Sequence, residues 1–174
     1  NRSAPLISFL DKYSNPSFQP NFQYYRDKVF SDICHSLLTL GETHPIFETH
    51  PRCTFLKAQW IHVNEKNYLK ADTLFLEALS KVKLAQDSDL AQMGKDFFLN
   101  RLKMLETGEL PSQITRTGFI LNTLNTALPF AIPFRSCKNT LAPKIFTLSR
   151  QIPSFELPQN FNEHFKVCEW FSAL

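Results

Sequence analysis

The chain has 174 residues, 43% of them hydrophobic, with 17 phenylalanines and a formal net charge of +3. This length and apolar content suit one domain with a packed core and exclude a disordered chain. The composition also excludes glycine-rich phosphate loops and disfavours β-sandwiches and barrels, because only four scattered glycines occur: Gly41, Gly94, Gly108 and Gly118.

Helical periodicity dominates the start of the chain. The sequence predicts a short helix over Pro5–Tyr13, closed by a break rich in serine, asparagine and proline. Apolar residues then recur at three- and four-residue steps as far as Gly41, which is typical of an amphipathic helix that ends at a glycine. The inward-facing residues of this second helix are expected to be Phe22, Tyr25, Val29, Ile33, Leu37 and Leu40.

Between Phe55 and Lys83, small and large residues alternate as two closely packed antiparallel helices require. Alanines leave room where two helix backbones cross, and aromatic side chains fill the space beside them. The polar run Asn64-Glu65-Lys66-Asn67 is the break that we expect between the helices. The residues predicted to meet are Phe55, Ala58 and His62 on the first helix and Tyr68, Ala71, Phe75 and Ala78 on the second.

This hairpin segment, from Phe55 to Lys83, resembles a single tetratricopeptide repeat in its order of aromatic, small and large residues. It departs from the family pattern at Gln59, where a small residue is preferred, and at Lys83, where proline is common. No second copy lies one period away, and arrays of this kind need at least three repeats. The resemblance therefore implies a helical hairpin and not a concave peptide groove. The composition, rich in phenylalanine and asparagine, resembles that of bacterial effector proteins.

Two further helices are predicted in the middle of the chain. The first can be capped by Asp87 or Ser88 and is expected to end at Gly108. The second is amphipathic, begins after Gly118 and is expected to be stopped by Pro129 and Pro133. Its buried side is predicted to carry Phe119, Ile120, Leu121, Leu124 and Leu128, and its polar side Asn122, Thr123, Asn125 and Thr126.

A short helix over Pro143–Leu148 and a last helix over Phe161–Phe171 complete the prediction. No run of useful length alternates with a period of two, so strands are not expected. The predicted fold is a single all-α domain over residues 1–174, of about seven helices in an irregular arrangement with the hairpin at its centre. Because the first residue is Asn1 rather than Met, we expect this domain to be a piece of a longer protein.

The four cysteines, Cys34, Cys53, Cys137 and Cys168, are widely spaced and include no Cys-x-x-Cys pair. In a chain with this much apolar content, we expect buried thiols of a reducing compartment, although an even number of cysteines also allows two disulfides. The predicted location is cytoplasmic, or the host cytosol if the protein is a secreted effector.

Two chemical sites were weighed on the histidines and cysteines. His44, His50 and Cys53 bring zinc-ligand types into one loop, but a structural site needs four ligands and the supporting pair is missing. His164 and Cys168 are spaced to share a helix face, as a thiol nucleophile and its base could. Packing explains both sets more simply, so we expect no metal, no cofactor and no catalytic residue. A cysteine-dependent hydrolase or transferase stays an alternative.

The strongest functional signal is the segment from Leu110 to Pro153, which contains no acidic residue. Its charge is +5, whereas the whole chain is +3, so the remainder of the chain is −2. Phenylalanines interleave with the cations, as suits a surface that holds phosphate and dips into a membrane interface. The residues predicted to bind an acidic, phosphoinositide-like headgroup are Arg116, Arg135, Lys138, Lys144 and Arg150.

The function predicted is therefore a non-catalytic recognition or targeting module with peripheral membrane contact. The alternative is a protein–protein interaction domain that uses the hairpin and exposed aromatic residues near Trp60 or Tyr68. No apolar stretch reaches the ~20 residues of a transmembrane helix. Nucleic acid is not an expected partner, because a net charge of +3 is small and no binding motif is present.

Overall fold

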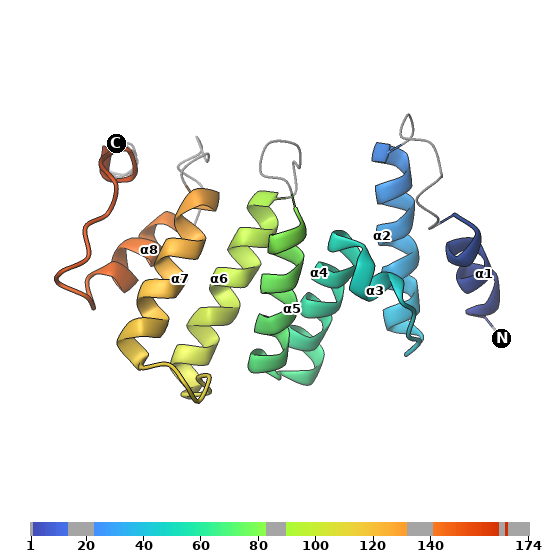
Figure 1. The fold of residues 1–174 in the computed structure, drawn as a ribbon, viewed down its shortest axis with the longest axis horizontal. Helices are drawn as coiled ribbons and strands as arrows, with labels where there is room; N and C mark the ends of the chain where they lie inside the picture. Colours follow the sequence, from blue (N-terminus) through green and yellow to red (C-terminus); the bar gives the residue numbers. More distant parts are fainter. Residues whose placement is uncertain (1, 14–22, 83–89, 132–140, 164–165, 167–174) are drawn as a thin grey trace, which may run out of the picture. The chain divides into compact units, whose positions relative to one another are not determined.

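The computed structural model describes residues 2–13, 23–82, 90–131, 141–163 and 166. Within these ranges the regular elements are helices and no strand occurs (Figure 1), so the all-α prediction is confirmed. The chain divides into two compact units, Asn1–Lys83 and Leu84–Leu174. Whether the two units unfold together, as the predicted single domain would, is a separate question and stays a prediction.

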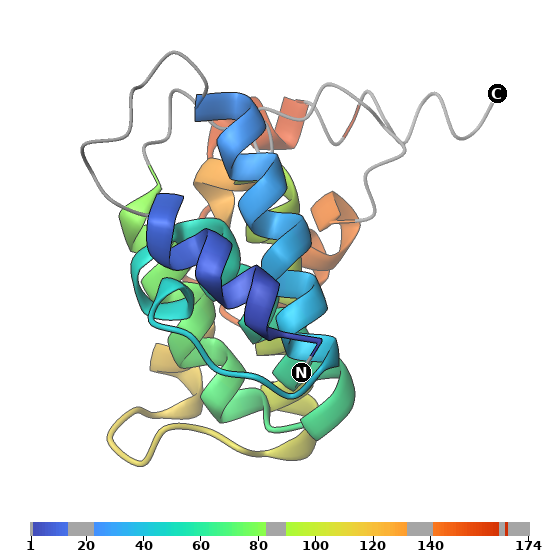
Figure 2. The same cartoon turned by 90° about the vertical axis from the view of Figure 1, so that its right-hand side faces the viewer.

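The described part of unit 1 contains five α-helices and one π-helical turn. Helix α1 lies against the side of α2 (Figures 1 and 2), where the Phe9 and Phe30 rings meet edge-on at 6.5 Å. Helix α2 ends just before Gly41, whose φ of +71° is the left-handed backbone that favours glycine. The elements are α1 (Ala4–Tyr13), α2 (Gln23–Thr39), α3 (Ile46–Thr49), α4 (Pro51–Trp60), η2 (Ile61–Glu65) and α5 (Tyr68–Lys81).

The buried stripe of α2 is centred differently from the predicted one. Val29 and Leu40 are 40% and 42% exposed, so their assignment to the inward face is wrong. Phe30 and Cys34 face the interior instead, because the stripe that packs on α1 and α4 is rotated by one residue. The core cluster of unit 1 consists of Leu10, Phe30, Ile33, Cys34, Leu37, Leu38, Ile46, Phe47 and Cys53.

A disulfide joins α2 to α4 inside this core. Cys34 and Cys53 are bonded with their Cα atoms 5.7 Å apart, and both side chains are fully buried. The prediction of buried thiols is therefore wrong for this pair. Nineteen residues separate the two cysteines in sequence, and only the packing of α2 on α4 shows that their Cβ atoms meet. Cys137 and Cys168 lie outside the described residues.

The predicted hairpin forms from α4, η2 and α5. The ring centroids of Phe55 and Phe75 are 5.7 Å apart, and those of His62 and Tyr68 are 5.2 Å apart, which fixes an antiparallel register. As predicted, the alanines at the crossing are fully buried and contribute no bulk; they are Ala58, Ala71 and Ala78. The match to the tetratricopeptide repeat family itself stays a prediction.

The break between the hairpin helices is shorter than predicted. The first helix continues through a π-helical turn to Glu65, and the Asn64 side chain donates to the Trp60 carbonyl at 3.1 Å. Only Lys66 and Asn67 lie between the helices. Lys66 adopts a left-handed φ of 51°, and the Asn67 side chain accepts from the Lys70 amide as the N-cap of α5.

In unit 2, helices α6 (Leu90–Thr107), α7 (Arg116–Ala131) and α8 (Leu141–Ser149) are followed by helical residues 159–163. α6 and α7 pack antiparallel and approach most closely where Gly94 faces Phe130. Gly108 follows α6 with a φ of +76°, as predicted for its end. The largest fully buried side chains of this unit are Phe97, Phe98, Phe119, Met93, Met104 and Leu124.

Three predictions for unit 2 need correction. α7 begins at Arg116 rather than after Gly118, because the Thr115 hydroxyl caps it by accepting from the Gly118 amide at 3.1 Å. α7 also continues through Pro129, whose missing N–H would have bonded near the helix end. Thr123, predicted on the polar side, is fully buried. The predicted caps at Asp87 and Ser88, and most of the predicted last helix, lie outside the described residues.

Among the helices of the described ranges, none has the length and apolar character needed to cross a membrane.

Candidate functional site

The structure describes three of the five predicted binding residues. Arg116 starts α7, Lys144 lies in the first half of α8, and Arg150 directly follows α8. Arg135 and Lys138 lie outside the described residues. Lys144 and Arg150 are therefore the described cations of the acid-free segment that lie on or directly after α8.

Arg116 has a structural partner of its own. Its Nη1 donates to the carbonyl oxygen of Leu105 at 3.2 Å. Leu105 lies in the last turn of α6, where carbonyl groups lack intrahelical partners and a cation is favourable. Arg116 thus helps to close the end of α6, and its guanidinium is less available to a ligand than the other two cations.

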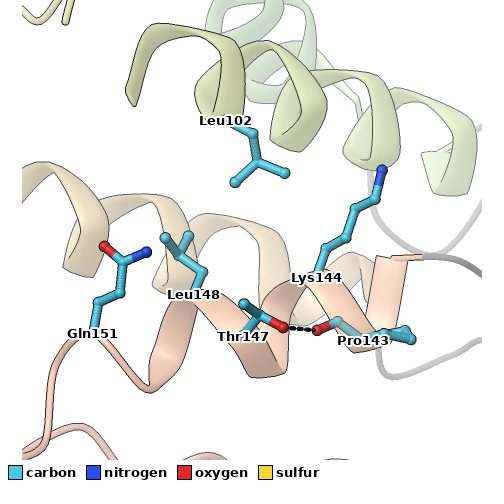
Figure 3. Close-up of a pocket in the computed structure, with 6 residues that line it drawn as sticks. All are labelled: Leu102, Pro143, Lys144, Thr147, Leu148 and Gln151. Atoms are coloured by element: carbon cyan, nitrogen blue, oxygen red, sulfur yellow. Dashed lines mark hydrogen bonds between the residues drawn. The ribbon is translucent and has the colours of Figure 1, made fainter. Parts of the chain in front are cut away.

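Lys144 lies beside a cavity between α6 and α8 (Figure 3). The cavity has a volume of about 240 Å³. In Figure 3, Leu102 extends from α6 toward α8, and the Lys144 side chain extends from α8 toward α6. The Thr147 hydroxyl donates to the Pro143 carbonyl at 2.9 Å, so its proton is already used. The lining residues are Leu102, Pro143, Lys144, Thr147, Leu148 and Gln151.

Arg150 lies over the ring of Phe146, with its guanidinium carbon 4.3 Å from the ring centroid. Stacking of this kind pre-orients the guanidinium while leaving its N–H edge free to donate. A second cavity of about 370 Å³ opens beside this pair. The residues that line it are Phe146, Ser149, Arg150, Ile152, Pro153, Phe155, Leu157 and Asn162.

Lys144 and Arg150 do not form one continuous patch. They are six positions apart, which places them about a third of a turn apart around the helix axis. Each is exposed and lies at its own cavity. Within the described ranges, neither forms an ion pair with a carboxylate, whereas Lys103 of the same unit pairs with Glu106 at 3.0 Å. The acidic remainder of the chain therefore does not neutralise the two cations of α8 there.

A cation that the sequence analysis overlooked is Arg101 of α6, which is only 4% exposed. Its guanidinium lies between the rings of Phe97 and Phe119, at 4.9 and 4.4 Å from their centroids. It donates to the Asn122 side chain at 3.0 Å and the Thr123 hydroxyl at 3.3 Å. The sequence contains an indication of this burial, because Arg101 lies four residues after Phe97 on the apolar stripe of α6. Arg101 joins α6 to α7 and does not face a ligand.

The histidine and cysteine hypotheses lose their main groups. The sulfur of Cys53 is bonded to Cys34, so neither is a thiolate that could bind zinc or attack a substrate. His44 lies 2.7 Å from the Asp11 carboxylate, and the ring of His50 meets that of Phe30 edge-on at 5.6 Å. No cluster of metal-ligating side chains occurs in the described ranges. His164 and Cys168 lie outside them.

No family model matches this chain, and no curated protein or solved structure matches it either.

Proposed function

We propose that this protein is a non-catalytic recognition module that binds an acidic, phosphoinositide-like membrane headgroup through the cations of the segment 110–153. The observation that carries the proposal is the pair Lys144 and Arg150. Both lie exposed on or beside α8, both adjoin a cavity, and neither forms an ion pair in the described part of the chain. The proposal also includes Arg135 and Lys138, which lie outside the described residues, whereas Arg116 contributes less because it bonds the Leu105 carbonyl.

The energetics of such a surface are modest for each residue. Near an anionic leaflet, each cation contributes about 1 kcal/mol, and the attraction falls off within a Debye length. Headgroup selectivity must therefore come from geometry. Arg150 suits that role because its planar guanidinium can bond two phosphate oxygens, whereas Lys144 acts as a point charge. Phe146 and Phe155 line the cavity beside Arg150 and offer an apolar edge.

The test is flotation of the purified protein with vesicles of neutral lipid, of phosphatidylserine and of neutral lipid with a few per cent phosphoinositide. We expect Lys144→Glu/Arg150→Glu to abolish binding to phosphoinositide vesicles without changing the melting temperature, because both side chains are exposed. The matched control is Lys70→Glu/Lys103→Glu, which changes the net charge equally at exposed cations outside the segment.

If the control variant lost binding to the same extent, the loss would be explained by the change in net charge alone. That result would overturn the assignment of the site to Lys144 and Arg150. Absence of binding to every vesicle would overturn the membrane proposal. Equal binding to phosphatidylserine and phosphoinositide would keep the membrane contact and overturn headgroup selectivity.

A second candidate, a protein–protein interaction through the hairpin, has a specific observation in its favour. The hairpin exposes aliphatic residues: Val63 is 66% exposed, Leu69 42% and Leu76 36%. Leu69 and Leu76 are two helical turns apart and share one face of α5. The aromatic residues proposed for this role, Trp60 and Tyr68, are half-buried instead. Under this hypothesis, Leu69→Ser/Leu76→Ser abolishes cross-linking to the partner, and the glutamate variants of α8 do not.

The Cys34–Cys53 disulfide bears on the predicted cytoplasmic location. Disulfides persist in oxidising compartments and are rare in the cytosol, where thiols are kept reduced. We therefore propose that the bridge forms outside a reducing cytosol. Because anionic lipids of the phosphoinositide type belong to the cytoplasmic leaflet, this proposal and the headgroup proposal agree only if the protein folds in an oxidising compartment before it meets that leaflet.

A further inference from the structure

We propose that the cavity between α6 and α8 is a binding site for a small amphiphilic carboxylate. This goes beyond headgroup recognition, because the ligand is a single molecule held within unit 2 and no bilayer is needed. The site combines an apolar wall with one ammonium group at its edge. Its lining residues come from α6, from α8 and from the turn directly after α8.

The apolar part of the site is formed mainly by Leu102 and Leu148, and Pro143 also lines the cavity. Leu102 and Leu148 come from different helices and lie in the middle of the cavity, between Lys144 at one end and Gln151 at the other (Figure 3). An elongated ligand fits this order, with its hydrocarbon body over the leucines and its charged end at Lys144. Contact with the leucines removes hydrocarbon from water, which supplies affinity without direction.

The size of the cavity limits the ligand. Its volume of about 240 Å³ exceeds the ~150 Å³ of an engineered cavity that binds benzene and is below the ~300 Å³ at which sites for drug-sized ligands begin. The cavity opens to solvent, so its volume sets the part of a ligand that it can cover, which is one hydrocarbon segment or one aromatic ring. The ligand class is a medium-chain fatty acid or an aromatic acid.

The single positive charge of Lys144 favours a ligand that carries one negative charge. Among the described residues that line the cavity, Lys144 is the only cation and none is a carboxylate. Lys144 has no ion-pair partner in the described ranges, so its ammonium can bond an incoming anion without losing another contact. One ammonium balances one carboxylate. The Gln151 amide, at the far end, can accept or donate to a second polar group.

The experiment is a titration of the full chain with octanoate, observed by the methyl NMR signals of leucine and by calorimetry. Octanol and octylammonium serve as probes of the same length without the negative charge. We expect saturable octanoate binding that perturbs Leu102 and Leu148, weaker octanol binding and no octylammonium binding. Lys144→Met should weaken octanoate binding at least about tenfold, because a charge-assisted hydrogen bond is lost, and Lys144→Arg should restore most of it.

The control is Lys103→Met, which removes an exposed α6 cation that does not line the cavity and should leave octanoate affinity unchanged. Leu102→Trp, which fills the cavity from α6, should abolish binding of octanoate and octanol alike. Equal affinities for octanoate and octanol, or unchanged affinity in Lys144→Met, would overturn the proposal. So would the absence of saturable octanoate binding to a folded wild-type chain. Vesicle flotation and the octanoate titration are independent measurements. Absence of octanoate binding would leave the headgroup proposal standing, and absence of vesicle binding would leave the carboxylate proposal standing.

Discussion

Gly94 is a residue of unit 2 that has no room for a larger side chain. A Cβ atom at this position would lie 2.4 Å from the Cβ of Phe130, which is far inside van der Waals contact. The atom that it meets is attached directly to the backbone of α7, so no flexible end can move aside. An added side chain would therefore force α6 and α7 apart.

We predict that Gly94→Ala destabilises the protein by about 1–3 kcal/mol, the usual cost of overpacking, although alanine is the better helix former. The measurement is urea unfolding monitored by circular dichroism. Gln92→Ala is the control, because Gln92 is exposed on the same helix and should change the stability by a few tenths of a kcal/mol. A Gly94→Ala protein as stable as the wild type would mean that α6 and α7 do not meet at this glycine.

The burial of a residue could be predicted where it depends only on the size of its side chain. It could not be predicted where it depends on a hydrogen-bond partner from another helix. Ala58, Ala71 and Ala78 are buried as expected, because only small residues fit where two backbones cross. Arg101 was given no role, and Thr123 was assigned to the polar side of its helix. Their burial depends on each other, since the guanidinium of one bonds the hydroxyl of the other across two helices. Such a pair is visible only after the helices are placed.

At the scale of elements, helix ends proved more predictable where a glycine determines them. Gly41 and Gly108 both take the left-handed conformation, which is a local property of that residue. The π-helical turn over Ile61–Glu65 was not predicted, because Asn64 and Glu65 belong to a polar run that was read as the break between the helices. Pro129 is the converse case, since its effect depends on how close the helix end lies.

The disulfide is the element-scale feature with the largest expected effect on stability. It ties α2 to α4 across 19 residues within the core of unit 1. Closing a loop of this size restricts the unfolded chain and contributes about 3 kcal/mol in the chain-entropy account. We predict that Cys34→Ala/Cys53→Ala lowers the stability of the oxidised protein by about 3 kcal/mol.

Mass spectrometry of alkylated protein without reductant shows whether the bridge is present, and thermal unfolding with and without dithiothreitol measures its contribution. The double variant should not respond to dithiothreitol, while the wild type should lose stability to nearly the level of the variant. Free, alkylatable Cys34 and Cys53 in protein folded under oxidising conditions would contradict the bridge.

At the scale of the whole molecule, the sequence identified a basic segment but could not convert it into a surface. The absence of acidic residues between Leu110 and Pro153 is a property of the list of residues. Which cations share a face depends on helix packing, and packing gave Arg116 a carbonyl partner and Arg150 a ring. Among the described cations of the segment, Lys144 has neither a carbonyl partner nor a ring contact, and it lies beside a largely apolar cavity. The candidate site is therefore narrower than the predicted one.

The largest open question at this scale is whether residues 1–174 unfold as the single domain that the sequence predicts. Unit 1 has a core cluster contributed by α1, α2, α3 and α4, a disulfide inside it, and polar contacts that hold both ends of α1. The Ser3 hydroxyl donates to Glu42 at 2.7 Å near one end, and His44 lies 2.7 Å from Asp11 near the other. A segment with its own core can fold alone.

We predict that residues 1–83 expressed alone are helical and unfold cooperatively, and that Phe30→Ala, which empties the centre of the core, abolishes this cooperativity. In the full chain, calorimetry should then resolve two transitions. Cys34→Ala/Cys53→Ala should lower only the transition of unit 1, and Gly94→Ala only that of unit 2, because each change lies within one core. One transition lowered by both changes would show that the units unfold together, since residues in a single cooperative unit share its free energy of unfolding. That result would establish the single domain.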